Sequence, residues 1–122
     1  MNKTKLPPHS LGKQGEEAAV QYLKKKHYKI WERGFRLYRG EIDIIASHKK
    51  TLVFVEVKTR KDPSFGYPEE SVTSNKIKQI KKIAQGYLTV KKLHNVECRF
   101  DVLSLLYDPQ NGFSIQHFKD AF

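Results

Sequence analysis

The chain contains one cysteine, Cys98, among 122 residues, and it has no long apolar run. A single thiol cannot form an intrachain disulfide, which excludes the disulfide-stapled class of small secreted domains and favours a reducing compartment. A membrane-spanning helix needs about 20 consecutive apolar residues, and the basic residues 1–8 lack the apolar stretch of a signal peptide. These absences predict a cytoplasmic protein with no membrane partner.

Acidic residues are also scarce. Thirteen Asp and Glu stand against 23 Lys and Arg, which gives a formal net charge of +10. On a small domain this excess must appear at the surface, where it attracts polyanions, because each neutralised phosphate releases condensed counterions. The charge therefore favours nucleic acid as the partner, although a basic surface that serves only solubility has the same composition.

The length and the 39% hydrophobic content fit one core, and 122 residues are too few for two ordinary domains. No repeat, low-complexity tract or linker divides the chain. We predict a loose basic arm over residues 1–9, followed by a single domain over residues 10–122.

Hydrophobic periodicity predicts a helix from Ser10, as its N-cap, to about Lys26, and a second helix capped by Ser74. Alternating and β-branched segments predict strands. The predicted strands are residues 28–37, 41–46, 51–59, 96–107 and 113–118. The order αβββαββ is that of an α/β sandwich around a mixed sheet, with an antiparallel central meander.

Two neighbouring predicted strands each carry charged side chains on one face, because successive side chains of a strand point to opposite faces. The predicted faces are Glu56 and Lys58 on residues 51–59, and Glu41 and Asp43, opposite Ile42, Ile44 and Ala46, on residues 41–46.

A hairpin that turns at Lys49 and Lys50 would place Asp43 directly opposite Glu56. Side chains so paired have Cβ atoms about 5 Å apart. Two carboxylates at that separation repel each other unless a cation lies between them. Mg²⁺ prefers a few carboxylates, several waters and a phosphate oxygen, so the pair predicts a metal site.

Lys58 completes a set suited to phosphodiester hydrolysis, because a lysine can neutralise the charge that grows on the phosphorus while the metal activates water. The alternative is an exposed Glu56–Lys58 pair, which would contribute only about 0.2–1 kcal/mol. The flanking valines favour a strand covered on both faces, where unpaired charge is costly. Buried charge clusters are often functional, and we favour a site.

An ordered series of motifs covers nearly the whole chain past residue 10. It runs Gly12-x-x-Gly15-Glu16-x-x-Ala19-x-x-Tyr22-Leu23, Gly40-Glu41-Ile42-Asp43-Ile44-Ile45, Phe54-Val55-Glu56-Val57-Lys58-x-Arg60, Phe65-Gly66-x-Pro68, Lys76, Ala84-x-x-Tyr87-Leu88 and Arg99-Phe100-Asp101-Val102. On these motifs the chain resembles the YraN family of uncharacterised, endonuclease-like bacterial proteins. That family is similar to archaeal Holliday junction resolvases within the PD-(D/E)xK nuclease superfamily.

The resemblance implies a restriction-endonuclease-like core and a nuclease that uses Mg²⁺ or Mn²⁺. Asp43 and Glu56 match the two acidic ligands of the superfamily, and Lys58 matches its lysine. Glu16 matches the acidic residue of the first helix that often helps to hold the metal or its water. Glu-Ile-Asp stands where the superfamily label has Pro-Asp, a departure that is normal for the YraN group. Resolvase-like relatives act as dimers, so the resemblance also implies a homodimer.

Other charged residues have two readings each. Glu16 can hold a metal or complement a helix N-terminus, and Glu41 can support Asp43 or face solvent at the start of its strand. Lys76 can reach a phosphate or extend along an apolar surface. Arg60 and Lys61 open a loop over residues 61–67 whose basic and aromatic side chains, Phe65 and Tyr67 among them, can track a nucleic-acid backbone. Arg99 and Asp101 are expected to form a structural pair near the sheet edge.

Three functions remain open. The first is an endonuclease that acts on nucleic acid, with DNA favoured over RNA, of branched, flapped or single-stranded structure. A chain this small has little surface for reading a long base sequence, so we expect recognition of backbone or structure. The second is a non-catalytic nucleic-acid-binding module that retains the nuclease fold, and the third is an accessory protein whose partner is a protein.

Overall fold

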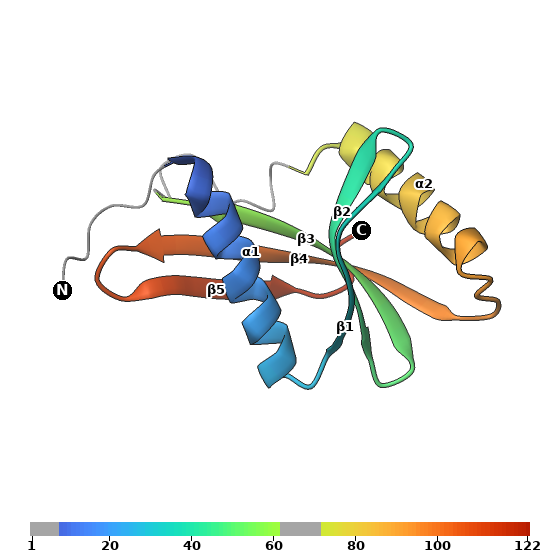
Figure 1. The fold of residues 1–122 in the computed structure, drawn as a ribbon, viewed down its shortest axis with the longest axis horizontal. Helices are drawn as coiled ribbons and strands as arrows, with labels where there is room; N and C mark the ends of the chain where they lie inside the picture. Colours follow the sequence, from blue (N-terminus) through green and yellow to red (C-terminus); the bar gives the residue numbers. More distant parts are fainter. Residues whose placement is uncertain (1–7, 62–71) are drawn as a thin grey trace.

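Within residues 8–61 and 72–122, which the computed structural model describes, five strands form one mixed sheet between two helices (Figure 1). The elements are α1 (Pro8–Lys25), β1 (Lys29–Leu37), β2 (Gly40–His48), β3 (Thr51–Arg60), α2 (Ser74–Val90), β4 (Glu97–Asp108) and β5 (Gly112–Phe118). The predicted order αβββαββ is confirmed, and it is consistent with a restriction-endonuclease-like fold.

Both predicted helix caps are wrong: α1 begins two residues before Ser10, and the cap of α2 lies one residue before Ser74. α1 begins at Pro8, so Ser10 lies inside its first turn and is not its cap. The fixed φ of proline suits the first position of a helix. α2 is capped by Thr73, whose extended backbone lets its hydroxyl accept a hydrogen bond from Lys76 N at 3.2 Å. The helix thus starts inside the segment predicted as a loose arm, and residues 1–7 of that segment lie outside the described residues.

The strand order is β1-β2-β3-β4-β5. β1, β2 and β3 form the predicted antiparallel meander, whereas β3 and β4 are parallel. A parallel pair needs a long crossover connection, and α2 lies within that connection. In the described sheet β5 pairs with β4 only from Val102 onward, so Arg99 and Asp101 have a strand neighbour on the β3 side alone. They form the predicted pair near the sheet edge, with Arg99 Nε 2.8 Å from Asp101 Oδ1.

Each face of the sheet is covered by one helix, which divides the core into two clusters. Val53 and Val55 of β3 pack with Leu23 beneath α1, while Phe54 packs with Tyr87 beneath α2. Alternation along β3 sends these side chains to opposite faces, as a strand buried on both sides requires. In the described part of the chain, neither helix has the combination of length and hydropathy needed to cross a membrane.

α1 approaches β3 closely at Gly15. A Cβ atom at this position would overlap the Thr59 hydroxyl and would lie 3.1 Å from Thr59 Cγ2. Gly12, one turn earlier, has nothing within 4 Å of such an atom. Gly15 therefore sets how near the first helix can lie to the third strand.

Gly15→Ala is expected to destabilise the protein by about 1–3 kcal/mol, because the added methyl group forces α1 away from Thr59. Urea unfolding measures the loss. Gly12→Ala is the matched control, and it should be neutral or up to about 1 kcal/mol stabilising, since alanine favours an exposed helix position. The cost of Gly15→Ala should shrink in a Thr59→Ala background, and an equal cost there would contradict this account.

Candidate metal centre

β2 and β3 form a hairpin, and the acidic residues Glu41 and Asp43 of β2 lie just beyond the last pair of this hairpin. Ile44 lies opposite Val55, and the pairing continues to His48 opposite Thr51. This is the register expected for a turn at Lys49 and Lys50. In the described sheet the β2–β3 pairing stops at Ile44, immediately before Asp43.

Asp43 interrupts the regular alternation of β2. Ile42 packs in the cluster beneath α2 and Ile44 in the cluster beneath α1, so the prediction that they share one face is wrong. The Asp43 Oδ2 atom accepts a hydrogen bond from Val57 N at 2.8 Å. Pairing with β1 also passes over Asp43 and Gly34, which has a φ of +63°. The Asp43 carboxylate thus takes the place of a backbone acceptor for Val57 N. The strand is irregular at this point, and the side chains on either side of Asp43 point to faces that regular alternation would not give them, as at a β-bulge.

Three carboxylates meet beside this irregularity. Glu16 of α1 and Glu41 and Asp43 of β2 each offer one oxygen, and these atoms lie within 4.8 Å of one another. Mg²⁺ and Mn²⁺ prefer oxygen ligands of this type, so the donor set fits either ion. Asp43 and Glu16 are two of the predicted ligands, and the structure adds Glu41, predicted only as a supporting residue.

Glu56 is buried close to this group, but it is not one of the three converging carboxylates. Its side chain is only 6% exposed, and its Oε2 atom lies 3.3 Å from Lys58 Nζ and 3.8 Å from Lys76 Nζ. Lys76, at the start of α2, therefore lies close to Glu56 and Lys58. Its predicted contact with a phosphate stays a prediction. The two ammonium groups balance the charge of the buried Glu56 carboxylate.

Asp43 has the most perturbed electrostatic environment of these acids. Burial raises the pKa of Asp43 most, and the charges of Glu56, Glu16 and Glu41 raise it further. The hydrogen bond from Val57 N opposes this change, and the resulting pKa is about 7 instead of 3.8. A buried carboxyl that lacks compensating positive charge is a place where a cation can bind favourably.

Arginines from β1 partly balance the other two acids. Arg33 Nη2 lies 3.7 Å from Glu16 Oε1, and Arg36 Nε lies 3.3 Å from Glu41 Oε1. Among the described residues, no basic side chain forms an ion pair with Asp43. The predicted site residues do not include Arg33 or Arg36, although a two-residue turn after β1 places Arg36 opposite Glu41 and could have indicated it.

A cavity of about 350 Å³ opens beside these acids, and its lining residues come from α1, β2 and β3. Its lining residues are Gly12, Lys13, Glu16, Asp43, Val57, Lys58, Thr59 and Arg60. Arg60 thus joins Lys58 at the predicted place, and Lys13, three residues before Glu16 on α1, is an addition. Lys61 is exposed and does not line the cavity, and the rest of the predicted loop, with Phe65 and Tyr67, lies outside the described residues.

Asp43→Asn is expected to stabilise the metal-free protein increasingly as pH rises from about 4 to about 8. The unfolded chain loses the Asp43 proton near pH 3.8 and the folded chain near pH 7, so the native aspartate costs stability across that window. Urea unfolding in the presence of chelator measures the difference. Asp108→Asn, in an exposed turn, is the control and should not show this increase. A constant difference between Asp43→Asn and the native protein would contradict the raised pKa.

Comparison with known proteins identifies the family. The family model described as "Uncharacterised protein family UPF0102" matches residues 15–105. The chain is 48% identical over 120 residues to a UPF0102 protein of Chlorobium limicola, covering 94% of this chain and 93% of the relative. It is 50% identical over 113 residues to one of Geotalea daltonii, covering 93% and 89%, and 43% identical to one of Caldicellulosiruptor saccharolyticus over the whole of both chains. The chain therefore belongs to the uncharacterised family UPF0102, the YraN family that its motifs resemble.

Proposed function

We propose that the protein is an endonuclease that depends on Mg²⁺ or Mn²⁺ and hydrolyses phosphodiester bonds in DNA. The single observation that carries the proposal is Asp43, a half-buried carboxyl that is surrounded by acids and has no basic partner in the described structure. A structural role would be served better by a neutral side chain, because buried charge without a partner destabilises the fold. A metal-binding role explains why the charge is there.

Each side chain of the site has a role that its position supports. Glu16, Glu41 and Asp43 would hold the ion. A bound Mg²⁺ or Mn²⁺ supplies polarisation of the scissile phosphate and a water of lowered pKa. Lys58, which lines the same cavity, would neutralise charge that develops on the phosphorus.

Glu56 is proposed as a further ligand of the ion. In the structure it contacts two lysines, so binding an ion requires a change in the position of its side chain. Its carboxylate lies between Lys58 and Lys76, so it must turn from these ammonium groups to reach an ion beside Asp43. Release of the two lysines would leave both free to contact phosphate oxygens. Coupling between the acid and the lysines would thus link metal binding to substrate binding.

The substrate is proposed to be DNA of branched, flapped or single-stranded structure. Lys13 and Arg60 at the cavity and Lys76 at the start of α2 offer contacts to the phosphate backbone, which position a duplex without reading its sequence. Lys61 follows Arg60 directly and extends this basic edge. The homodimer implied by the resolvase resemblance stays a prediction.

Divalent ions should stabilise the protein through Glu41 as well as through Glu16 and Asp43. At an ion concentration of a hundred times the dissociation constant, the gain is about 2.7 kcal/mol, and thermal unfolding with Mg²⁺ or Mn²⁺ measures it. Glu41→Gln should abolish most of the gain. Glu17→Gln is the matched control, because Glu17 is exposed on α1 beside Glu16 but lies outside the three-carboxylate group. Full ion-dependent stabilisation in Glu41→Gln would remove Glu41 from the site.

Cleavage is the direct test of the nuclease proposal. Single-stranded, duplex and four-way-junction DNA are incubated with the protein and Mn²⁺, with a chelator control. Asp43→Ala, Glu56→Gln and Lys58→Gln should each lower the metal-dependent rate by about a hundredfold or more. The first two variants lose a carboxylate proposed to hold the ion, and the third loses the charge that would neutralise the phosphorus centre. Glu17→Gln should cleave at the native rate. Salt-sensitive binding without cutting by any variant or the native protein would instead support a non-catalytic nucleic-acid-binding module.

A further inference from the structure

A second cavity, of about 300 Å³, lies on the α1 side of the sheet and shares no lining residue with the candidate metal centre. Its lining consists of two tyrosines, two histidines and two lysines. These residues are Tyr22, Lys26, Tyr28, His48, His117 and Lys119. The lining contains no carboxylate, whereas the cavity beside Asp43 is lined by both acidic and basic side chains.

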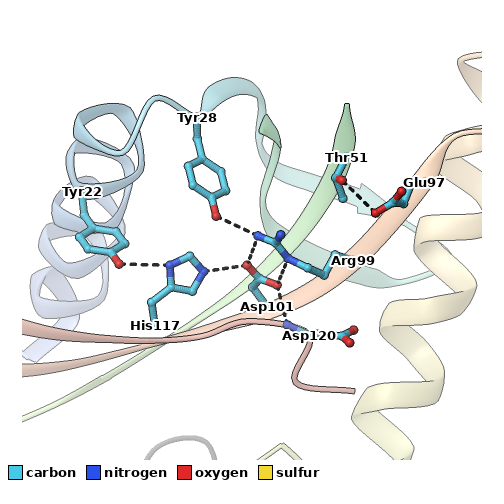
Figure 2. Close-up of polar contacts among 8 residues, drawn as sticks. All are labelled: Tyr22, Tyr28, Thr51, Glu97, Arg99, Asp101, His117 and Asp120. Atoms are coloured by element: carbon cyan, nitrogen blue, oxygen red, sulfur yellow. Dashed lines mark hydrogen bonds and ion pairs between the residues drawn. The ribbon is translucent and has the colours of Figure 1, made fainter. Parts of the chain in front are cut away.

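The acid nearest this cavity is already satisfied within the protein. Asp101 is fully buried, and it accepts hydrogen bonds from Arg99 Nε at 2.8 Å, His117 Nε2 at 2.7 Å and Asp120 N at 3.0 Å (Figure 2). Burial alone would raise the pKa of Asp101, but these hydrogen bonds outweigh it and lower the pKa to about 2. The carboxylate therefore stays ionised and fully engaged behind the wall of the cavity.

The same network fixes the polar atoms of the wall. In the neutral tautomer in which Nε2 of His117 donates to Asp101, its Nδ1 atom accepts a hydrogen bond from the Tyr22 hydroxyl, and these two atoms lie 3.1 Å apart. The pKa of Tyr22 is raised by burial, so its hydroxyl stays protonated and is no activated nucleophile. Figure 2 shows His117 between the Tyr22 hydroxyl and the Asp101 carboxylate. The network is thus a rigid support rather than a catalytic set.

Tyr28 has a hydroxyl hydrogen that no residue in the described ranges accepts. Its hydroxyl oxygen accepts a hydrogen bond from Arg99 Nη2 at 2.8 Å. Tyr28 is only 5% exposed, so an unsatisfied donor here is costly. His48 stacks on the Tyr28 ring, with centroids 4.2 Å apart and planes 9° from parallel, and it has no hydrogen bond to a described residue.

The two lysines also have spare capacity for a ligand. Lys26 contacts the Tyr22 ring, with its Nζ atom 5.8 Å from the ring centroid, and neither it nor Lys119 forms an ion pair with a described residue. Positive charge also surrounds His48, because Lys49, Lys119 and Arg99 are among the groups that lower its pKa after burial. The cavity therefore offers ammonium, hydroxyl and imidazole donors without an acidic acceptor.

We propose that this cavity binds a phosphate monoester. Two ammonium groups, the Tyr28 hydroxyl and an N–H of His48 match the charge and the several acceptor oxygens of a tetrahedral dianion better than a carboxylate with two oxygens. The volume is at the lower end of the range of roughly 300–1,000 Å³ for small-ligand pockets. A free nucleotide and the 5′-phosphate of a nucleic-acid strand both carry this group. The proposal does not rest on the nuclease function, because the two cavities share no residue.

The test follows the ring signals of His48 and His117 by NMR while inorganic phosphate is added to the full chain at constant ionic strength. We expect a saturable shift of the His48 signals. Lys119→Gln and Lys26→Gln should each weaken the apparent affinity roughly tenfold, because each removes a charge-assisted contact. Lys78→Gln, an exposed lysine of α2 that lines neither cavity, is the matched control and should bind as the native protein does.

Further probes identify the source of the phosphate. Adenosine monophosphate and short oligonucleotides with a 5′-phosphate or a 5′-hydroxyl are compared with acetate. Tighter binding of the nucleotide indicates a free ligand, and tighter binding of the 5′-phosphorylated strand indicates a strand end; either result supports the proposal. No saturable shift with any phosphate probe, equal binding of acetate, or an equal loss in Lys78→Gln would overturn it.

Discussion

The hydrogen bond from Val57 N to Asp43 Oδ2 is the contact on which the arrangement of the site depends. It replaces a backbone pairing at the point where the β2–β3 ladder ends, and it holds a carboxylate where a regular strand would present a carbonyl group. The strand then changes face between Ile42 and Ile44, which fill the clusters beneath the two helices. The apolar packing on either side thus keeps Asp43 in place although its charge is unfavourable there.

The distribution of basic side chains around the site follows from the same constraint. Glu56 has two lysine partners, which balance its charge, and arginines of β1 partly balance the charges of Glu16 and Glu41. The charge of Asp43 is not balanced by a described side chain, and its pKa is raised accordingly. The unbalanced charge of Asp43 therefore lowers the stability of the fold, while the proposed chemistry requires that charge. Such a conflict is common at sites that bind a ligand.

α1 contributes to both cavities, although they differ in charge. Its first half supplies Glu16 and Lys13 to the cavity beside Asp43, and its second half supplies Tyr22 to the cavity near His117. The close contact of Gly15 with Thr59 positions the helix at one end, and the hydrogen bond between Tyr22 and His117 positions it at the other. Each cavity thus depends on how this helix lies across the sheet.

The element order, the two-sided burial of β3 and the β2–β3 register could be predicted from the sequence, because they depend on local periodicity and on the position of a short turn. These features alone bring Asp43 to the neighbourhood of Glu56. Only the tertiary structure decided that Glu41 joins Glu16 and Asp43, that Glu56 contacts two lysines, and that Tyr22 meets a histidine 95 residues away. Those contacts depend on the Asp43 side chain, which replaces a backbone hydrogen bond of the sheet, and on the packing of the helices against opposite faces. Neither feature produces a periodic pattern in the sequence from which it could be predicted.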